Sequence, residues 1–226
     1  MKLYLIRHAE SLNNARPVYE RISDPPLTAR GRLQAQGLAD WLTKLQHDVL
    51  ITSPFRRTLE TTRAFLDQSP RRVHVWHQVF ENGGCFEGHE PANHSGAPGL
   101  GRTDIRRLAH ADEELCIVDD TITEDGWWNQ PHRETPQESE QRTKSVVARF
   151  VDEFGATRQS VVAILHADFI RGLVAEMLGP SVSIGRLGPF VNVGVTLLRY
   201  QDGQWHLDWL NSISHVPPRL VTGKEH

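Results

Sequence analysis

Short apolar runs alternate along the chain with longer stretches in which apolar residues recur at helical spacing. Four of these runs have the length and composition of β-strands and lie at residues 2–6, 49–52, 73–76 and 161–165. The run at 161–165 contains no polar residue, which is typical of a central strand buried on both faces. Residues 193–200 and 205–210 are joined through Asp202-Gly203 and predict a hairpin of two further strands.

Helical patterns fill the intervals between the strands. Thr28 can cap a helix that reaches about residue 46 and has Leu33 and Leu38 on its buried face. Ser53-Pro54 offers a cap followed by a proline in the first turn, and so predicts a second helix that reaches about residue 66.

The clearest helix signal begins at Thr135-Pro136-Gln137-Glu138. It combines a capping threonine, a first-turn proline and a glutamate three residues after the cap, and Gly155 ends the helix. A last helix is expected from about Asp168 to Leu178. The alternation of strands and helices predicts an α/β fold, namely a three-layer α/β/α sandwich with a mostly parallel central sheet.

Length and composition favour one domain. The 226 residues, 38% of them hydrophobic, are enough for a single sizeable core. Between residues 89 and 134 the periodicity fails and proline and glycine are frequent, so we expect a lid-like insertion over the site there. Trp127 and Trp128 fit packing within this insertion better than a stacking platform for a base.

Charge and cysteine content narrow the function classes. The formal net charge is −3, from 25 basic and 28 acidic residues, which argues against a nucleic-acid binder, and no lysine-rich block indicates an anionic membrane. No stretch has the length of a signal-peptide core or a membrane span, so a cytoplasmic protein with a small-molecule partner is expected. Cys85 and Cys116 are too few for a disulfide framework and are interpreted as free thiols.

Polar residues follow several of the predicted strands. The candidates, each after a different strand, are His8, Arg57, Glu81 and His166. In an open parallel sheet ligands bind beyond the carboxyl ends of the strands, so the fold would bring these side chains to one edge. The arginines would repel a cation, whereas Arg7 and Arg57 can form bidentate hydrogen bonds to a phosphoryl group and a neutral His8 can attack phosphorus.

No metal or other cofactor is expected. The remaining histidines of the middle segment have spacings that match no regular metal motif, and scattered surface positions explain them better; they are His89, His94, His110 and His132. Arg102, Arg106 and Arg107 in the same segment could recognise a second phosphate or a carboxylate, or could form a solvated helix face.

The first two polar segments resemble motifs of the histidine phosphatases, also called the phosphoglycerate mutase-like superfamily. Arg7-His8-Ala9-Glu10-Ser11 followed by Asn14 is similar to the arginine-histidine-glycine-glutamate signature of that family, with Ala9 in place of glycine. Residues 53–58, Ser-Pro-Phe-Arg-Arg-Thr, resemble its second block. This resemblance implies that Arg57, rather than Arg56, binds phosphate.

Two later segments complete the resemblance, which spans residues 2 to about 178. Glu81 with Gly83-Gly84 is similar to the acidic segment of the family and implies Glu81 as proton donor, although the spacing keeps Glu87 as an alternative. The heptapeptide from Leu165 to Arg171 matches the second-histidine block, with Ala167 where glycine is usual.

The resemblance also implies a mechanism in one histidine phosphatase domain covering residues 1–226. His8 would attack phosphorus and become phosphohistidine, Glu81 would protonate the leaving alkoxide, and no metal would take part. The phosphoryl oxygens would be held by Arg7, Asn14, Arg57, His166 and the amide of Ala167.

The sequence therefore predicts a metal-independent phosphatase that hydrolyses phosphate monoesters of small metabolites. Two alternatives stay open. One is phosphoryl transfer of the phosphoglycerate mutase type, which would use the same residues; the other is a non-catalytic module that binds a phosphorylated ligand. The substrate and the oligomeric state are not fixed by the sequence, and a homodimer is compatible with it.

Overall fold

The computed structural model describes residues 1–110 and 112–223. Its central sheet has seven strands in the order β6-β3-β2-β7-β1-β8-β9. The strands are β1 (Lys2–Arg7), β2 (Val49–Thr52), β3 (Val73–Val75), β6 (Cys116–Val118), β7 (Ser160–Leu165), β8 (Val195–Gln201) and β9 (Gln204–Ser212). Five of them pair in parallel, and at one edge β8 pairs antiparallel with β1 and β9 pairs antiparallel with β8. The predicted mostly parallel sheet is confirmed.

Strand β7 lies at the centre of the sheet, as its apolar run indicates. It pairs in parallel with β1 on one side and with β2 on the other. All five residues from Val161 to Leu165 have no exposed surface. The hairpin of β8 and β9 also forms as expected, and Asp202 and Gly203 both adopt positive φ in its turn.

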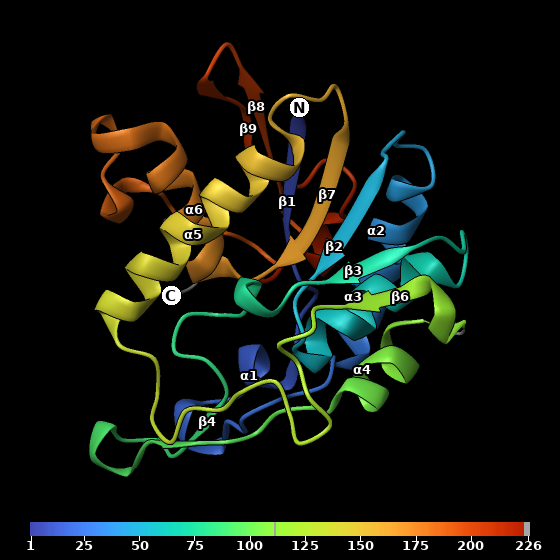
Figure 1. Ribbon diagram of the computed structural model, residues 1–226. Coiled ribbons are helices and arrows are strands. Elements are labelled where there is room, and N and C mark those ends of the chain that lie inside the picture. The colour runs from blue at the N-terminus through green and yellow to red at the C-terminus, as the bar shows by residue number, and fades with distance from the viewer. Residues whose placement is uncertain (111, 224–226) are drawn as a thin grey trace.

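Helices cover both faces of the sheet (Figure 1). One face is covered by α2 (Ala29–Leu42), α3 (Arg56–Leu66) and α4 (Arg102–Ala109), and the other by α5 (Pro136–Phe154) and α6 (Ala167–Leu178). Successive residues of β1 alternate between the two cores: Tyr4 and Ile6 pack toward α2 and α3, and Leu3 and Leu5 toward α5 and α6. The three-layer α/β/α sandwich is therefore confirmed.

The helix starts agree with the sequence at two of three caps. The Thr28 hydroxyl accepts a hydrogen bond from the amide of Gly31, and Thr135 forms the expected capping box. The predicted cap at Ser53 is wrong, because α3 begins at Arg56 and the Ser53 hydroxyl bonds the imidazole of His166 instead. The prediction that Leu33 lies on the buried face of this helix is wrong, because 60% of its surface is exposed. The helix α2 also ends at Leu42, earlier than predicted.

For the segment 89–134 the sequence predicts a lid-like insertion, but the structure places the middle of this segment in the main fold. Residues 102–118 supply α4 and the edge strand β6, which extends the main sheet through pairing with β3. Strand β6 is not predicted from the sequence, because its apolar run is only three residues long and lies among polar residues. Trp127 is fully buried with its ring centroid 4.6 Å from that of Phe55, so the packing interpretation of this tryptophan is confirmed.

Small elements and loops gather at the carboxyl ends of the parallel strands, at the lower end of the molecule in Figure 1. They include α1 (Leu12–Ala15) and the two-stranded ribbon of β4 (Phe86–Glu87) and β5 (Ser95–Gly96). Both cysteines are buried, and neither forms a disulfide within the described residues. No helix within the described residues combines the length and apolar character needed to cross a bilayer.

Two leucines on α2 provide a test of the core. Leu38 is 1% exposed and Leu33 is 60% exposed. We expect Leu38→Ala to lower the free energy of unfolding by roughly 2–5 kcal/mol, because it leaves a cavity in the core. The matched control Leu33→Ala should change it by less than about 0.5 kcal/mol. Urea unfolding followed by circular dichroism measures both; equal effects would contradict the placement of this helix.

Candidate active site

A pocket of about 460 Å³ opens at the carboxyl edge of the parallel strands. The chain reaches it from the ends of β1, β3 and β7 and from the first turn of α3, so segments far apart in the sequence meet there. Six predicted site residues line it: Arg7, His8, Asn14, Arg57, Glu81 and Ala167. His166 lies just behind, with its ring centroid 5.3 Å from that of His8. A larger groove of about 840 Å³ between α5 and α6 contains none of these residues.

His8 is held as a neutral imidazole with one nitrogen available. Its Nδ1 lies 2.7 Å from the carbonyl oxygen of Ala9, which can only accept, so Nδ1 carries the proton. The lone pair of Nε2 then accepts a hydrogen bond from Nε of Arg57 at 3.2 Å. Burial, followed by the charges of Arg57 and Arg7, lowers the pKa of His8 well below the ordinary histidine value. The side chain thus has the protonation state of a nucleophile.

Arg7 and Arg57 bring two buried positive charges to the pocket. Arg7 donates from Nη1 to the carbonyl of Phe190 at 2.5 Å, and its buried Nε has no hydrogen-bond partner within the described residues. Arg57 lies over the ring of Phe55, 4.0 Å from its centroid. Burial is the main cause that lowers the pKa of both, to about 10 for Arg7. Both groups stay charged at neutral pH and favour an anion.

The second histidine is fixed by a residue that sequence reasoning assigned another role. Nε2 of His166 lies 2.8 Å from the hydroxyl of Ser53, and its buried Nδ1 has no partner within the described part of the chain. Burial and the charge of Arg57 lower the pKa of His166. Ser53 directly follows β2, and His166 directly follows the neighbouring parallel strand β7. Both residues therefore lie at the same edge of the sheet, and this is the sequence signal for their contact.

Glu81 lies at the N-terminal end of α6. Its carboxylate accepts hydrogen bonds from the amides of Phe169 at 3.0 Å and Asp168 at 3.4 Å. Burial and the charge of Asp168 raise the pKa of Glu81, and Arg57 together with the amides acts in the opposite direction. The alternative acid, Glu87, is exposed on β4 at the rim of the pocket.

Asn14 presents its amide nitrogen because its oxygen is occupied. Oδ1 of Asn14 accepts from the amide and the hydroxyl of Ser11, at 3.0 and 3.1 Å, in a capping box that starts α1. Asn14 lines the pocket from α1, the short helix that follows β1. The structure therefore places all the predicted site residues together, and leaves Nδ2 of Asn14 as a donor for a ligand oxygen.

Asn192 supports the end of β1 and was missed by the sequence. Its side-chain Nδ2 donates to the carbonyl of His8 at 3.0 Å, and its backbone amide donates to the carbonyl of Thr222 at 3.1 Å. Gly223 comes so close that a Cβ there would lie 2.4 Å from Nη1 of Arg7. Asn192 precedes β8, and the start of an antiparallel strand lies at the carboxyl edge of its parallel neighbours, which was the only signal for this contact.

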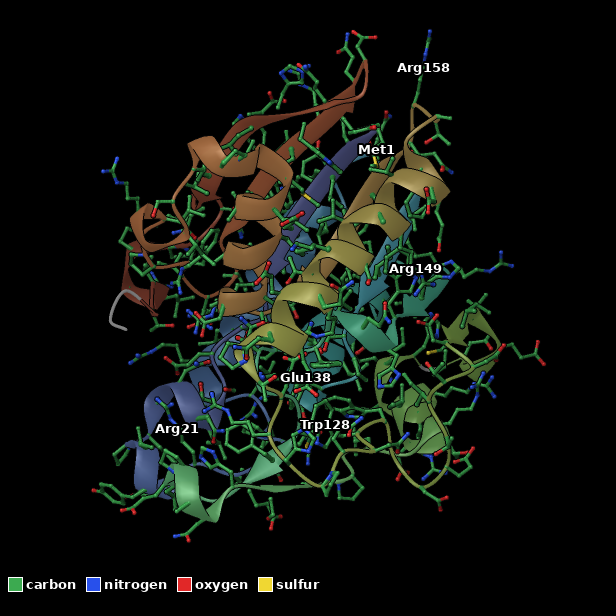
Figure 2. The ribbon with its side chains drawn as sticks, turned by 60° about the vertical axis from the view of Figure 1, so that its left-hand side comes forward. Met1, Arg21, Trp128, Glu138, Arg149 and Arg158 are labelled. Carbon is green, nitrogen blue, oxygen red and sulfur yellow. The ribbon has the colours of Figure 1, made fainter. Side chains whose placement is uncertain are left out.

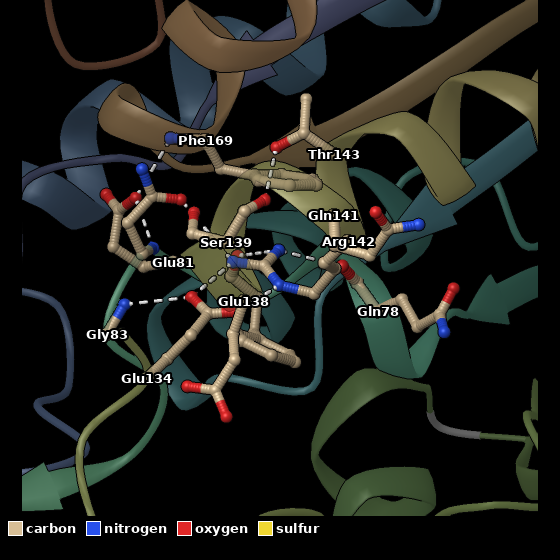
Figure 3. Close-up of polar contacts among 12 residues, drawn as sticks. Gln78, Glu81, Gly83, Glu134, Glu138, Ser139, Gln141, Arg142, Thr143 and Phe169 are labelled. Atoms are coloured by element: carbon tan, nitrogen blue, oxygen red, sulfur yellow. Dashed lines mark hydrogen bonds and ion pairs between the residues drawn. The ribbon is translucent and has the colours of Figure 1, made fainter. Parts of the chain in front are cut away.

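A buried ion pair anchors the loop that carries Glu81 (Figure 3). Nε and Nη2 of Arg142 donate to the two carboxylate oxygens of Glu134 at 2.6 and 2.7 Å, and the side chains are 7% and 4% exposed. Nη1 of Arg142 also donates to the carbonyls of Gln78 and Phe80, and Glu134 accepts from the amide of Gly83. The loop is thus held on both sides of Glu81.

The guanidinium of Arg142 is further enclosed by aromatic rings. It lies 3.8 Å from the ring centroid of Phe80 and 4.3 Å from that of Phe169, the residue whose amide bonds Glu81. Arg142 lies among other polar residues of α5, so no local signal separates it from the more exposed Arg149 of the same helix. Its contacts make it part of the support of the acid.

Together these groups can transfer a phosphoryl group. A neutral imidazole nitrogen faces a pocket with two buried cations, and a carboxyl group with a raised pKa lies in the same pocket. Arg102, Arg106 and Arg107, considered earlier as anion-binding candidates, do not line it. Within the described residues no group of three or more histidine, cysteine or acidic side chains is arranged to hold a metal ion.

Comparisons with known proteins point in the same direction. The model of the histidine phosphatase superfamily (branch 1) matches residues 3–213. The chain is similar to an adenosylcobalamin/alpha-ribazole phosphatase of Escherichia coli, with 26% identity over 79% of this chain and 80% of that protein. It is 25% identical to a glucosyl-3-phosphoglycerate phosphatase of Mycolicibacterium vanbaalenii over 95% of this chain and 96% of that protein.

A solved structure has the same fold. The alpha-ribazole phosphatase of Shigella flexneri superposes with a TM-score of 0.67, and the alignment covers 94% of this chain and 96% of that one at 24% identity. At this identity the likeness concerns the fold alone.

Arg142 and Glu134 allow a test of the buried support. We expect Arg142→Met to lower the free energy of unfolding by roughly 3–5 kcal/mol, because it leaves the Glu134 carboxylate buried without a partner. The double variant Arg142→Met, Glu134→Gln should lose less, since no charge is stranded. Lys144→Met removes a cation of the same helix from an exposed pair with Glu140 and is the control expected to stay near wild type. A double variant less stable than Arg142→Met would contradict this account.

Proposed function

The chain belongs to the histidine phosphatase superfamily, and on this premise we propose that it is a phosphatase that hydrolyses phosphate monoesters of small metabolites through a phosphohistidine on His8. The observation that carries the proposal is the state of His8. Its proton is on Nδ1, its pKa is lowered, and the lone pair of Nε2 points to the buried guanidinium of Arg57. An anion that takes up the hydrogen bond of Arg57 brings its phosphorus next to this lone pair.

The first step forms one bond and breaks another. Nε2 of His8 attacks phosphorus, the bond to the leaving oxygen breaks, and that oxygen takes a proton from the carboxyl group of Glu81. Arg7 and Arg57 hold the remaining phosphoryl oxygens together with the Asn14 amide, His166 and the amide of Ala167. The negative charge of the bound ester raises the pKa of Glu81 further, which keeps its proton in place until the leaving oxygen needs it.

The second step regenerates the enzyme. Glu81, now ionised, takes a proton from water, the resulting hydroxide attacks phosphorus, and the bond between phosphorus and Nε2 breaks. Inorganic phosphate leaves and His8 is again a neutral imidazole. Every step uses side chains of this chain, and none of them requires a metal ion.

The names of the relatives support hydrolysis over transfer to a second hydroxyl. The two relatives described above, which align over most of their length, are both named phosphatases. They differ in the compound they act on, so the substrate of this chain is a separate question. A phosphoglycerate mutase would return the phosphoryl group from His8 to an organic hydroxyl, and the release of inorganic phosphate distinguishes the two.

The setting of the enzyme is also part of the proposal. Two buried cysteines that form no disulfide within the described residues agree with a reducing compartment, and we infer a cytoplasmic enzyme. Association as a homodimer stays a prediction, to be checked by light scattering.

His8→Ala tests the nucleophile. We expect the wild type to release phosphate from a panel of phosphoglycerates, sugar phosphates and nucleotides with a chelator present, and the variant to release none above background, because no covalent intermediate can form. Acid quenching during turnover should trap an acid-labile phosphoryl group on the wild type only. Activity that the chelator abolishes, or that survives in His8→Ala, would overturn the mechanism.

Glu81→Gln tests the acid, with Glu87→Gln as matched control. We expect Glu81→Gln to lower kcat for an alkyl phosphate by roughly 100-fold to 10,000-fold. The loss should be smaller for para-nitrophenyl phosphate, whose phenolate leaves without a proton.

The pH profile gives the sign of each ionisation. A lowered pKa keeps His8 neutral at pH values where an ordinary histidine is protonated, so the acid limb of kcat/KM should lie below about pH 6.5. A raised pKa keeps Glu81 protonated above the ordinary range of a glutamate, and its ionisation produces the alkaline limb, which Glu81→Gln should remove. Ionisation of the ester is common to all variants and cancels in the comparison. A profile altered by Glu87→Gln instead would transfer the role to that residue.

A further inference from the structure

Beyond the proposed hydrolysis, and resting on it, we propose that the leaving group of the substrate carries a second anionic group, a carboxylate or another phosphate, bound by Arg133 and Arg21 at the pocket mouth. Both arginines line the pocket outside the buried phosphate site. Within the described residues neither guanidinium forms an ion pair with a carboxylate. The two positive charges at the mouth are therefore available to a ligand.

The position of the acid fixes where the leaving group must lie. Glu81 protonates the leaving oxygen, so the rest of the leaving group extends over the residues beside Glu81. Arg133 is immediately there: a Cβ on Gly83, two residues after Glu81, would lie 2.7 Å from its Nε. The guanidinium of Arg133 therefore lies against the loop that carries the acid, in the same pocket.

Contacts of the side chain and of the neighbouring backbone fix the position of Arg133. Its guanidinium lies 4.7 Å from the ring centroid of Phe86, and the other neighbour of that ring is His94, at a centroid distance of 4.7 Å. The backbone on either side of Arg133 is hydrogen-bonded to neighbouring segments. The carbonyl of Pro131 accepts from the amide of Gly96, and the amide of Glu134 donates to the carbonyl of Gly83. The charge is consequently presented at a fixed place.

Arg21 faces the pocket from a different segment, the loop after α1. The next residue, Ile22, forms two hydrogen bonds with the side chain of Asn13, at 2.7 and 3.0 Å, which tie this loop to the turn that follows His8. Figure 2 shows Arg21 at the loop end of the molecule, far from Arg158 at the opposite end. Two ordered segments thus bring one arginine each to the mouth.

The charges around the mouth leave an excess of cations. Among the lining carboxylates, Glu81 is the acid and Asp168 is paired with Arg171 at 2.5 Å, which leaves Glu87 alone against Arg21 and Arg133. A neutral leaving group would leave both guanidinium groups without use. An anion on the leaving group forms charge-assisted hydrogen bonds with them, and the planar fork of arginine suits a carboxylate or a phosphate.

The test compares phosphate esters that differ in the charge of the leaving group. The esters are those of para-hydroxybenzoate and para-hydroxybenzamide, with hydroquinone bisphosphate as the arm with a second phosphate. The measured quantity is the ratio of kcat/KM for an anionic ester to that for the benzamide ester. Because the intrinsic reactivity of each ester is the same for every variant, a change in this ratio reports recognition of charge.

We expect Arg133→Met to lower the ratio by roughly tenfold or more, the range of a lost charge-assisted hydrogen bond. Arg21→Met should lower it as well, and the charge reversal Arg133→Glu should lower it further. Arg133→Lys, which keeps the positive charge, should lower the ratio less than Arg133→Met does. The control Arg158→Met, at the other end of the molecule, should leave the ratio at its wild-type value. A fall with benzoate alone identifies a carboxylate site, and a fall with the bisphosphate alone identifies a second phosphate site.

An unchanged ratio in both Arg133→Met and Arg21→Met would overturn the inference. The proposed function is judged separately, by hydrolysis of the benzamide ester in the wild type and its loss in His8→Ala. If that hydrolysis is present while the ratios do not move, the phosphatase stands and the second anion site does not. Should Arg133→Met fail to fold, Arg21→Met alone decides the inference, with Arg133→Lys expected to show a smaller fall in the ratio.

Discussion

Two guanidinium groups, those of Arg7 and Arg57, are buried at the carboxyl edge of the sheet and form no ion pair within the described part of the chain. Removing such charges from water costs several kcal/mol each, and hydrogen bonds to the Phe190 carbonyl and to His8 offset only part of it. Burial and then the same two charges lower the pKa of His8 and keep it unprotonated, so the electrostatics that disfavour the empty pocket also prepare the nucleophile. A phosphate dianion resolves both requirements at once, because it neutralises the arginines and presents phosphorus to the imidazole.

The acid is governed by the opposite balance and by a different set of supports. Glu81 is drawn toward ionisation by the amides at the start of α6 and toward protonation by burial and Asp168. Its place depends on Arg142, which joins α5 to the loop after β3 through Glu134 and two backbone carbonyls. The nucleophile is thus held by the sheet, whereas the acid is held by contacts with helices, and the charge of Arg57 acts on the pKa of both.

Much of the fold and of the inner site could be predicted because each rests on local signals. The apolar run of β7 and the capping box at Thr135 identify their elements directly, and placing polar residues after parallel strands brings Arg57 and His166 to one edge. The rest depends on contacts between distant segments. Ser53 resembles a helix cap but bonds His166, and Arg142 resembles a solvent-facing helix residue but is buried among Phe80, Phe169 and Glu134. The short run of β6 becomes a strand only because β3 offers it a free edge.

The hydrogen bond from Asn192 to the carbonyl of His8 has a consequence for folding during protein synthesis. Strand β1 pairs with β7 and β8, and Asn192 is itself bonded to Thr222, so Arg7 and His8 find their partners in segments that come much later in the chain. The ribosome therefore synthesises Arg7 and His8 well before the residues that hold them in place. While the polypeptide is growing, these two residues remain in an unassembled segment, and the candidate active site forms only once Asn192 and Thr222 have left the exit tunnel.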